Sequence, residues 1–391
     1  MTVEMIKEAA ANFGTPSYVF DLDLLKERVD LINKYIGKKA LCCYAMKANP
    51  FIIGPMNEYT DKFEVCSPGE YEICNKMGIA PEKIVVSGVN KTYESMTRIM
   101  GLCGGKGIFT IESETHYEIL SKVCREQNTC IKVLIRLSSG NQFGVDKETF
   151  ERILQRIKQD DRIEIQGLHY YSGTQKKQKK IAKEIAMLEE YAEYIKTTYG
   201  IILHELEYGP GLSVTYFEGD DEFDPEEELA GFAEILDSVK AYEHITIEMG
   251  RFIATPCGYY LSSVVDIKKT EEHNICIIDG GIHQLNYYGQ IRGMKKPYMQ
   301  CISDGKDVKS YSVYGSLCTV NDVLLAAVDF PELSKGDFFA FERCGAYSVT
   351  EGMALFLTRE LPNVVFYSDK NGLQLVRKEI LTDGINSANI I

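Results

Sequence analysis

Three side chains that could take part in covalent or acid–base chemistry stand at or near the ends of short apolar runs. Lys47 follows the run 40–45. A lysine that is partly desolvated has a lowered pKa and can form a Schiff base with an aldehyde. His169 and Glu248 lie in two further runs and supply an imidazole and a carboxylate.

Two glycine-containing turns add a second kind of chemistry. Gly209-Pro210-Gly211 follows one apolar run, and Gly250 with Arg251 follows another. Backbone N–H groups of such turns, together with one guanidinium, can hold a phosphate group. A phosphate pocket, a Schiff-base lysine and a carboxylate that keeps a pyridine nitrogen protonated are the requirements of pyridoxal phosphate. The residues predict this cofactor if the fold brings them together.

The elements that must position these residues alternate regularly over the first 250 residues. Apolar runs rich in Val, Ile, Tyr and Phe stop at small or polar residues, as buried parallel strands do. Helix-like stretches such as Lys147–Gln159 and Lys179–Thr197 lie between them. This alternation predicts a (β/α)₈ TIM barrel, whose chemistry lies at the carboxyl ends of its strands; a doubly wound sheet would also alternate. The eight runs are 40–45, 62–67, 83–88, 107–113, 131–137, 163–171, 203–209 and 244–250.

After Arg251 the pattern changes to short strand-like runs separated by Gly, Pro and Asp. Long helical periodicity is absent there, which predicts an antiparallel β domain. Ser17–Asp21 is a further strand-like run before the expected first barrel helix and is expected to join that domain. We therefore expect a barrel over residues 25–250 and a β domain made of 1–24 and 251–391. The later runs are 258–268, 274–278, 309–313, 322–328, 337–341 and 364–367.

Composition and charge argue against several classes of protein, among them nucleic-acid-binding and membrane-spanning proteins. The 391 residues carry 43 Lys and Arg against 57 Asp and Glu, a formal charge of −14. Such a charge argues against nucleic acid or an anionic membrane as a partner. No apolar run reaches the length of a membrane span and no signal pattern opens the chain, so we expect a cytoplasmic protein. The 12 cysteines show no CxxC or zinc-ligand spacing, so we expect free thiols and no metal site.

The segments around these residues resemble the fold-type III pyridoxal-phosphate decarboxylases, which include diaminopimelate and ornithine decarboxylases. Residues 44–49 resemble the Schiff-base motif around Lys47. Residues 64–67 resemble the motif of the second strand, in which Glu64 would lie near the cofactor. Residues 248–251 resemble Glu-Pro-Gly-Arg, whose glutamate pairs with the ring nitrogen and whose glycine and arginine contact phosphate.

The resemblance implies further cofactor contacts. His169 matches the histidine that stacks on the pyridine ring, and residues 172–175 are similar to a Gly-Ser-Gln segment with one extra residue. Pro210 stands where the family has a glycine and removes one N–H donor. The residues implied to bind the cofactor are Lys47, Glu64, His169, Ser172, Gly209, Gly211, Glu248, Gly250, Arg251 and Tyr347.

In the β domain, residues 315–322 resemble the motif that enters the active site of a partner subunit. The family's fold is a barrel plus a β domain in a homodimer with shared active sites. Lys47 would then hold the cofactor, and the amino group of the substrate would displace Lys47 from it. CO₂ would leave while Glu248 stabilises the protonated ring nitrogen of the cofactor. Cys318 from the partner would return a proton to Cα.

The substrate-binding segments depart from the better-known members. Diaminopimelate decarboxylases have an acidic residue after the catalytic cysteine and an Arg-Pro pair after the Asp-Gly-Gly turn. This chain has Thr319 after Cys318, and residues 279–288 contain no Arg-Pro. The charged far end of diaminopimelate would therefore lack partners. Asp322 remains available to meet an amine, so diamines are disfavoured without being excluded.

The variant segments 209–220, 279–290 and 317–322 are similar to a subgroup that acts on amino acids tethered to acyl carrier proteins. The lysine run 176–180 is expected to follow the sixth barrel strand and to open a helix, where positive charge is unfavourable. In a protein of charge −14, such a run indicates a docking site for an acidic carrier or its phosphopantetheine phosphate. A solvated helix end explains the run equally well.

The leading hypothesis is thus a pyridoxal-phosphate-dependent amino-acid α-decarboxylase, with a carrier-bound amino acid as a candidate substrate. The alternative is a decarboxylase of free diaminopimelate or a basic amino acid. A racemase of the same fold class is less favoured because those enzymes place Arg where this chain has Glu248. A non-catalytic homologue is disfavoured because Lys47, His169, Arg251 and Cys318 are all retained. The sequence does not name the amino acid.

Overall fold

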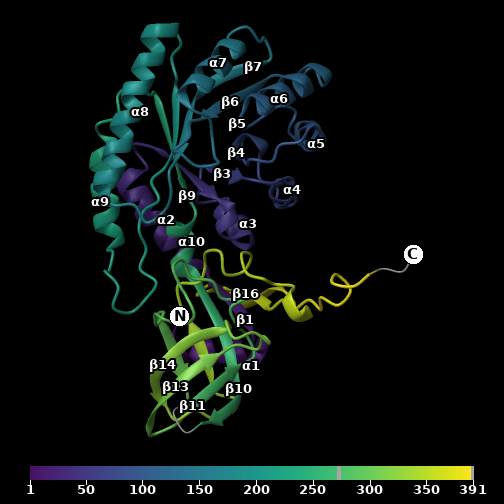
Figure 1. The fold of residues 1–391 in the computed structure, drawn as a ribbon, viewed down its shortest axis with the longest axis vertical. Coiled ribbons are helices and arrows are strands. Elements are labelled where there is room, and N and C mark those ends of the chain that lie inside the picture. Colours follow the sequence, from purple (N-terminus) through teal and green to yellow (C-terminus); the bar gives the residue numbers. More distant parts are fainter. Residues whose placement is uncertain (271–273, 389–391) are drawn as a thin grey trace. The chain divides into compact units, whose positions relative to one another are not determined.

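A computed structural model describes residues 1–270 and 274–388 (Figure 1). The chain divides into two compact units: Val29–Val214 with Phe223–Ile253, and Met1–Arg28 with Thr215–Glu222 and Ala254–Ile391. The expected boundaries placed residues 215–222 in the barrel. The structure groups them with the β unit because the N–H of Glu218 donates to the carbonyl of Lys296 at 2.8 Å, beside a bridge between Phe217 and Pro297.

The first unit is a closed barrel of parallel strands, as predicted, and not an open doubly wound sheet. Each strand pairs with the next, and β9 closes the ring against β2, with Glu248 opposite Cys43. All eight predicted runs form strands. Within the described residues these are β2 Leu41–Ala45, β3 Lys62–Val65, β4 Ile84–Val86, β5 Ile108–Ile111, β6 Ile131–Arg136, β7 Ile163–Tyr171, β8 Glu205–Gly209 and β9 His244–Met249.

Helices lie outside these strands in Figure 1. Their apolar positions recur at helical spacing, as in α7, where Phe150, Ile153, Leu154 and Ile157 are buried. No helix within residues 1–270 or 274–388 is long and apolar enough to cross a bilayer. The helices are α2 Leu22–Ile36, α3 Ile53–Met56, α4 Pro68–Lys76, α5 Tyr93–Cys103, α6 Glu114–Glu126, α7 Lys147–Ile157, α8 Gln178–Tyr199, α9 Pro225–Leu236 and α10 Arg251–Ala254.

The second unit is a sheet whose main path runs β14-β13-β11-β10-β1-β16-β17. Most pairs are antiparallel, as predicted, but β1 is parallel to β16 and β11 is parallel to β13. The run at Ser17–Asp21 forms β1 and joins this sheet, as expected. The strands are β1 Ser17–Asp21, β10 Gly258–Lys269, β11 Asn274–Ile278, β12 Met299–Ile302, β13 Val308–Tyr314, β14 Val323–Pro331, β15 Phe338–Phe341, β16 Asn363–Ser368 and β17 Gly372–Arg377.

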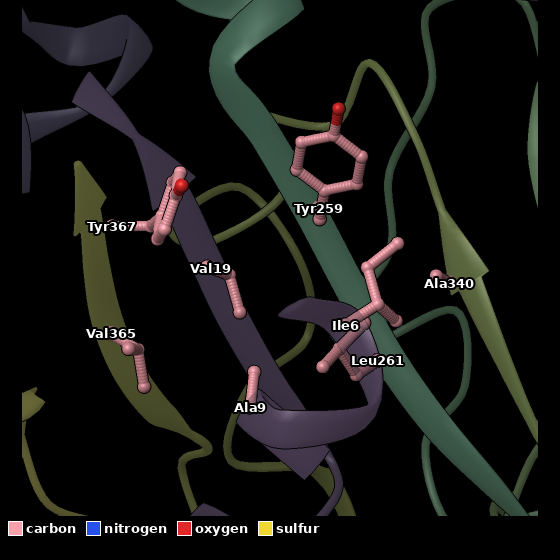
Figure 2. Packing of buried hydrophobic residues seen from close by; sticks show 8 residues of the cluster. All are labelled: Ile6, Ala9, Val19, Tyr259, Leu261, Ala340, Val365 and Tyr367. Atoms are coloured by element: carbon pink, nitrogen blue, oxygen red, sulfur yellow. The ribbon is translucent and has the colours of Figure 1, made fainter. Parts of the chain in front are cut away.

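Three elements of this unit are absent from the sequence-based expectations: β12, β17 and the helix α1 (Val3–Phe13). In α1, Ile6 and Ala9 are fully buried against β1, β10, β15 and β16 (Figure 2). Thr2 caps the helix by accepting the N–H of Met5. The apolar face of α1 therefore completes the core of the sheet on one side.

Candidate active site

Lys47 lies on a single 3₁₀ turn, Met46–Ala48, directly after β2. Its Nζ is 2.7 Å from Oε2 of Glu64 and 3.3 Å from Oε1 of Glu248. The Lys47 side chain is 38% exposed, whereas those of Glu64 and Glu248 are 2% and 6% exposed. A ligand can therefore reach the Lys47 amine from its exposed side, while the buried carboxyl groups of Glu64 and Glu248 contact it from the protein side.

The two carboxyl groups beneath Lys47 are electrostatically distinct. Burial, together with the negative charge of Glu248, raises the pKa of Glu64. Burial acts on Glu248 in the same direction, but Lys47 and His169 hold the pKa of Glu248 well below its ordinary value. The charged form is therefore favoured more strongly at Glu248 than at Glu64. A cationic ring nitrogen requires such a partner.

His169 belongs to the same cluster. Its Nε2 lies 3.1 Å from Oε2 of Glu248, and its side chain is 1% exposed. Its predicted stacking on the cofactor ring stays a prediction. Tyr171, two residues later on β7 and hence on the same side of the strand, is partly exposed. Burial and the charge of Glu248 raise the pKa of Tyr171, and Lys47 and Arg251 oppose the shift.

The glycine turns pack so closely against neighbouring residues that a side chain at these positions would collide with them. A Cβ on Gly209 would lie 2.4 Å from Cδ2 of Tyr171, and one on Gly211 would lie 2.2 Å from the carbonyl oxygen of Gly173. Gly211 also has a φ of +58°, which favours glycine. A Cβ on Gly250 would be 3.0 Å from the carbonyl oxygen of Ala45. With Arg251 at the start of α10, this donor set fits a phosphate group.

Ser172 and Lys176, which the sequence placed at the cofactor and on a docking surface, instead contact one another inside the barrel unit. The Ser172 hydroxyl donates to Oε1 of Glu184 at 2.5 Å and accepts from Lys176 Nζ at 3.3 Å. Lys176 is buried against Glu184. The prediction that the whole lysine run is a docking surface is therefore wrong for Lys176, because its charge is neutralised internally. Lys177, Lys179 and Lys180 are exposed.

The remaining predicted residues lie in the β unit. Cys318 is exposed, and Thr319 and Tyr347 are half-buried. Asp322 is buried, and its two oxygens accept the N–H groups of Ile282 at 2.9 Å and Leu317 at 2.8 Å. These bonds order the turn that carries Cys318. Each carboxylate oxygen can accept a second hydrogen bond, so these contacts leave acceptor sites for the substrate amine that the sequence suggested.

Sequence reasoning missed Glu207, which points into the barrel from β8. Its side chain is fully buried, and neither carboxyl oxygen has a hydrogen-bond partner within the described residues. Potential ligand atoms of His169, Glu207 and Glu248 all lie within 4.8 Å of one another. Burial raises the pKa of Glu207 well above its ordinary value, although Lys62 opposes the shift. Strand alternation was the available signal, since residues 207 and 209 share the inward face.

A second missed group is formed by Lys91, Glu112 and Arg136. Lys91 donates to the carbonyl of Gly88 at 2.7 Å, and burial lowers its pKa to about 8. Arg136 pairs with Glu112 at 3.3 Å, and all three side chains are buried. This lysine is the barrel amine that most closely rivals Lys47 as a nucleophile, because its lowered pKa leaves part of it uncharged near neutral pH.

Borohydride treatment of the protein with pyridoxal phosphate should fix the cofactor on the peptide that contains Lys47. The reason is that Lys47 alone among these amines is both accessible and held over Glu248. Lys47→Ala should abolish the label, as measured by peptide mass spectrometry, and Lys91→Ala should retain it. Labelling of Lys91 or Lys176 in the unaltered protein would show that the assignment is wrong.

Glu207→Gln should flatten the pH dependence of unfolding measured without cofactor. A carboxyl whose pKa is higher in the folded state keeps its proton there, while the unfolded chain releases it above the ordinary value of 4.5. Stability of the unaltered protein should therefore fall relative to the variant, by up to about 1.4 kcal/mol per pH unit as pH rises. Urea titrations at several pH values test this, with exposed Glu164→Gln as control. Parallel curves would contradict it.

Comparisons with known proteins agree with this geometry. Residues 22–255 match the family described as "Pyridoxal-dependent decarboxylase, pyridoxal binding domain". Diaminopimelate decarboxylase of Aquifex aeolicus is 27% identical over 372 residues, covering 88% of this chain and 84% of that protein. The 2-[(L-alanin-3-ylcarbamoyl)methyl]-2-hydroxybutanedioate decarboxylase of Staphylococcus aureus is 23% identical, covering 89% and 93%.

Solved structures share the fold. Diaminopimelate decarboxylase from M. jannaschii superposes with a TM-score of 0.87 at 21% identity, covering 98% of this chain and 94% of that one. The Helicobacter pylori diaminopimelate decarboxylase, complexed with L-lysine, gives a TM-score of 0.84 at 23% identity, covering 97% and 98%. The family match spans more than half of the sequence and contains the Lys47–Glu64–Glu248 cluster. The chain therefore belongs to the pyridoxal-dependent decarboxylases, carboxy-lyases that use pyridoxal phosphate as their cofactor.

Proposed function

We propose that the enzyme is an amino-acid α-decarboxylase whose substrate differs from diaminopimelate at its far end. The observation that carries the proposal is the accessible Lys47 amine held between the buried carboxyl groups of Glu64 and Glu248. When bound, the cofactor supplies an electron sink for the electrons released with CO₂. Lys47 would hold the cofactor, and the Glu248 carboxyl group would pair with its ring nitrogen.

His169 supports this arrangement from behind, because its contact with Glu248 helps to fix that carboxylate. Stacking on the cofactor ring stays a prediction for His169, and Tyr171 is a partly exposed aromatic ring on the same side of β7. Arg251 and the glycine turns would hold the phosphate group. The β unit would contribute Cys318, whose thiol holds the proton that returns to the substrate Cα.

The substrate is inferred from what the specificity segment lacks. Thr319 follows Cys318 where an acidic residue would read a distant amine, and the turn at residues 279–288 lacks an Arg-Pro pair. A buried charged group without a partner lowers affinity strongly. An amino acid whose far end is neutral, or is tethered to an acyl carrier protein, suits this segment. The Staphylococcus aureus relative is named for a substrate whose side-chain amine is acylated, although the acyl group itself carries the carboxylates of a hydroxybutanedioate.

The exposed lysines Lys177, Lys179 and Lys180 are the part of the lysine run that remains available to an acidic carrier. Lys180 lies 3.8 Å from Glu184, so its charge is partly offset. Free diaminopimelate is the second candidate, favoured by the names of several relatives. Decarboxylation of a carrier-bound amino acid should depend on the charge of these exposed lysines, whereas decarboxylation of free diaminopimelate should not.

Assays with free and carrier-bound amino acids distinguish them. We expect kcat/KM for meso-diaminopimelate to be at least about 100-fold below that for the preferred substrate, since its far end lacks partners. Lys177→Gln/Lys179→Gln/Lys180→Gln should raise KM for a carrier-bound substrate and weaken its salt dependence, with little effect on free amino acids. Efficient, salt-insensitive decarboxylation of free diaminopimelate would contradict the proposal and support the second candidate.

We propose further that the working unit is a homodimer in which Cys318 acts on the Lys47 of the partner subunit. Mixing Lys47→Ala and Cys318→Ala proteins should create heterodimers with one intact site out of two. Activity should recover to about a quarter of the unaltered value after random subunit exchange. Exchange shown by native mass spectrometry without recovered activity would mean that each site is built within one chain.

A further inference from the structure

The Gly209-Pro210-Gly211 turn has one backbone N–H donor fewer than a turn of three glycines would offer to a phosphate group. Pro210 has no N–H, so the peptide between Gly209 and Pro210 offers a carbonyl oxygen and no donor. A carbonyl turned toward a phosphate dianion would repel it. Some other group must therefore keep the carbonyl oxygens of this turn on the side away from the anion.

Lys176 contacts two of these carbonyl groups. Its Nζ donates to the carbonyl oxygen of Gly209 at 2.9 Å, and its own backbone N–H donates to the carbonyl oxygen of Gly211 at 2.9 Å. Lys176 thus binds the carbonyl oxygens of both glycines that flank Pro210. Gly211 lies close to the same segment, since a Cβ there would collide with Gly173.

The orientation of the Lys176 side chain is fixed by its other partners. Nζ lies 2.7 Å from Oε2 of Glu184 and 3.2 Å from the hydroxyl of Tyr208. The side chains of Lys176 and Glu184 are 2% and 9% exposed. A buried ion pair of this kind adds little net stability compared with apolar packing, so its retention calls for another purpose.

Burial lowers the pKa of Lys176, and Glu184 opposes that shift. Burial alone would raise the pKa of Glu184, but Lys176, Ser172 and Tyr208 hold it below its ordinary value. The 2.7 Å contact between Lys176 Nζ and Glu184 Oε2 has the geometry of an ion pair. A charged ammonium group makes stronger hydrogen bonds to carbonyl oxygens than a neutral donor does.

We propose that Lys176 is a positioning residue of the cofactor's phosphate site. By binding the carbonyl oxygens of Gly209 and Gly211, it directs them away from the anion and compensates for the N–H that Pro210 lacks. Glu184 in turn holds Lys176 in place. This inference rests on the cofactor site of the family and is independent of the substrate proposed above.

The test compares pyridoxal phosphate with pyridoxal, which has the same ring and aldehyde but no phosphate group. Full-length protein freed of cofactor is titrated with each, and binding is followed by absorbance and by quenching of tyrosine fluorescence. Lys176→Met should weaken binding of pyridoxal phosphate about tenfold or more, the loss of one charge-assisted bond. Pyridoxal affinity should change less than about twofold. The matched control is Lys183→Met, at an exposed lysine of helix α8, which also carries Glu184, and it should change neither affinity.

Lys176→Met leaves Glu184 buried without its partner and could fail to fold. Lys176→Met/Glu184→Met removes both charges, and circular dichroism and thermal unfolding establish that it is folded. It should show the same selective loss for pyridoxal phosphate. Equal weakening of both ligands, or unchanged affinity for pyridoxal phosphate, would overturn the proposal. If the unaltered protein itself bound no pyridoxal phosphate, the cofactor assignment would fail as well, whereas a failed substrate assay would leave this result standing.

Discussion

The active site depends on one shared positive charge, that of Lys47, between two buried carboxyl groups. Without Lys47, Glu64 and Glu248 would repel each other in a region that water does not reach, and one or both would take up a proton. With it, the pKa of Glu64 is still raised, while the pKa of Glu248 is held well below its ordinary value. The site thus sets the pKa values of two chemically identical groups apart before any ligand arrives.

Barrel closure creates this arrangement. Strand β2, which leads into Lys47, lies between β3 and β9, with Ala45 opposite Glu64 and Cys43 opposite Glu248. Residues separated by about half of the chain therefore become neighbours only when β9 pairs with β2. An open sheet would leave β2 and β9 at opposite edges, and Lys47 would contact Glu64 alone. The closed topology is a condition for the chemistry as well as for the core.

Much of this could be predicted from the sequence, because strands and their polar ends leave strong local patterns. The eight barrel runs, β1, Lys47 and Glu248 all follow from such patterns. Other features depend on the orientation of single side chains. Lys176 belongs to a lysine run whose sequence suggests exposure to solvent. Its side chain is nevertheless buried, because it forms an ion pair with the buried Glu184, eight residues later. His169 and Tyr171 share one face of β7, and only the structure distinguishes the buried ring from the accessible one.

The parallel pairing of β1 with β16 also bears on how the protein is made. Residues 17–21, all of them buried in the native sheet, pair with residues 258–261 and 363–367. A ribosome adds roughly 5–20 residues per second, so this apolar segment waits on the order of ten seconds or more for its first partner. During that time the whole barrel sequence emerges. The nascent chain therefore carries an unpaired strand through most of its synthesis, and chaperones that shield short apolar segments are expected to act on its first 30 residues.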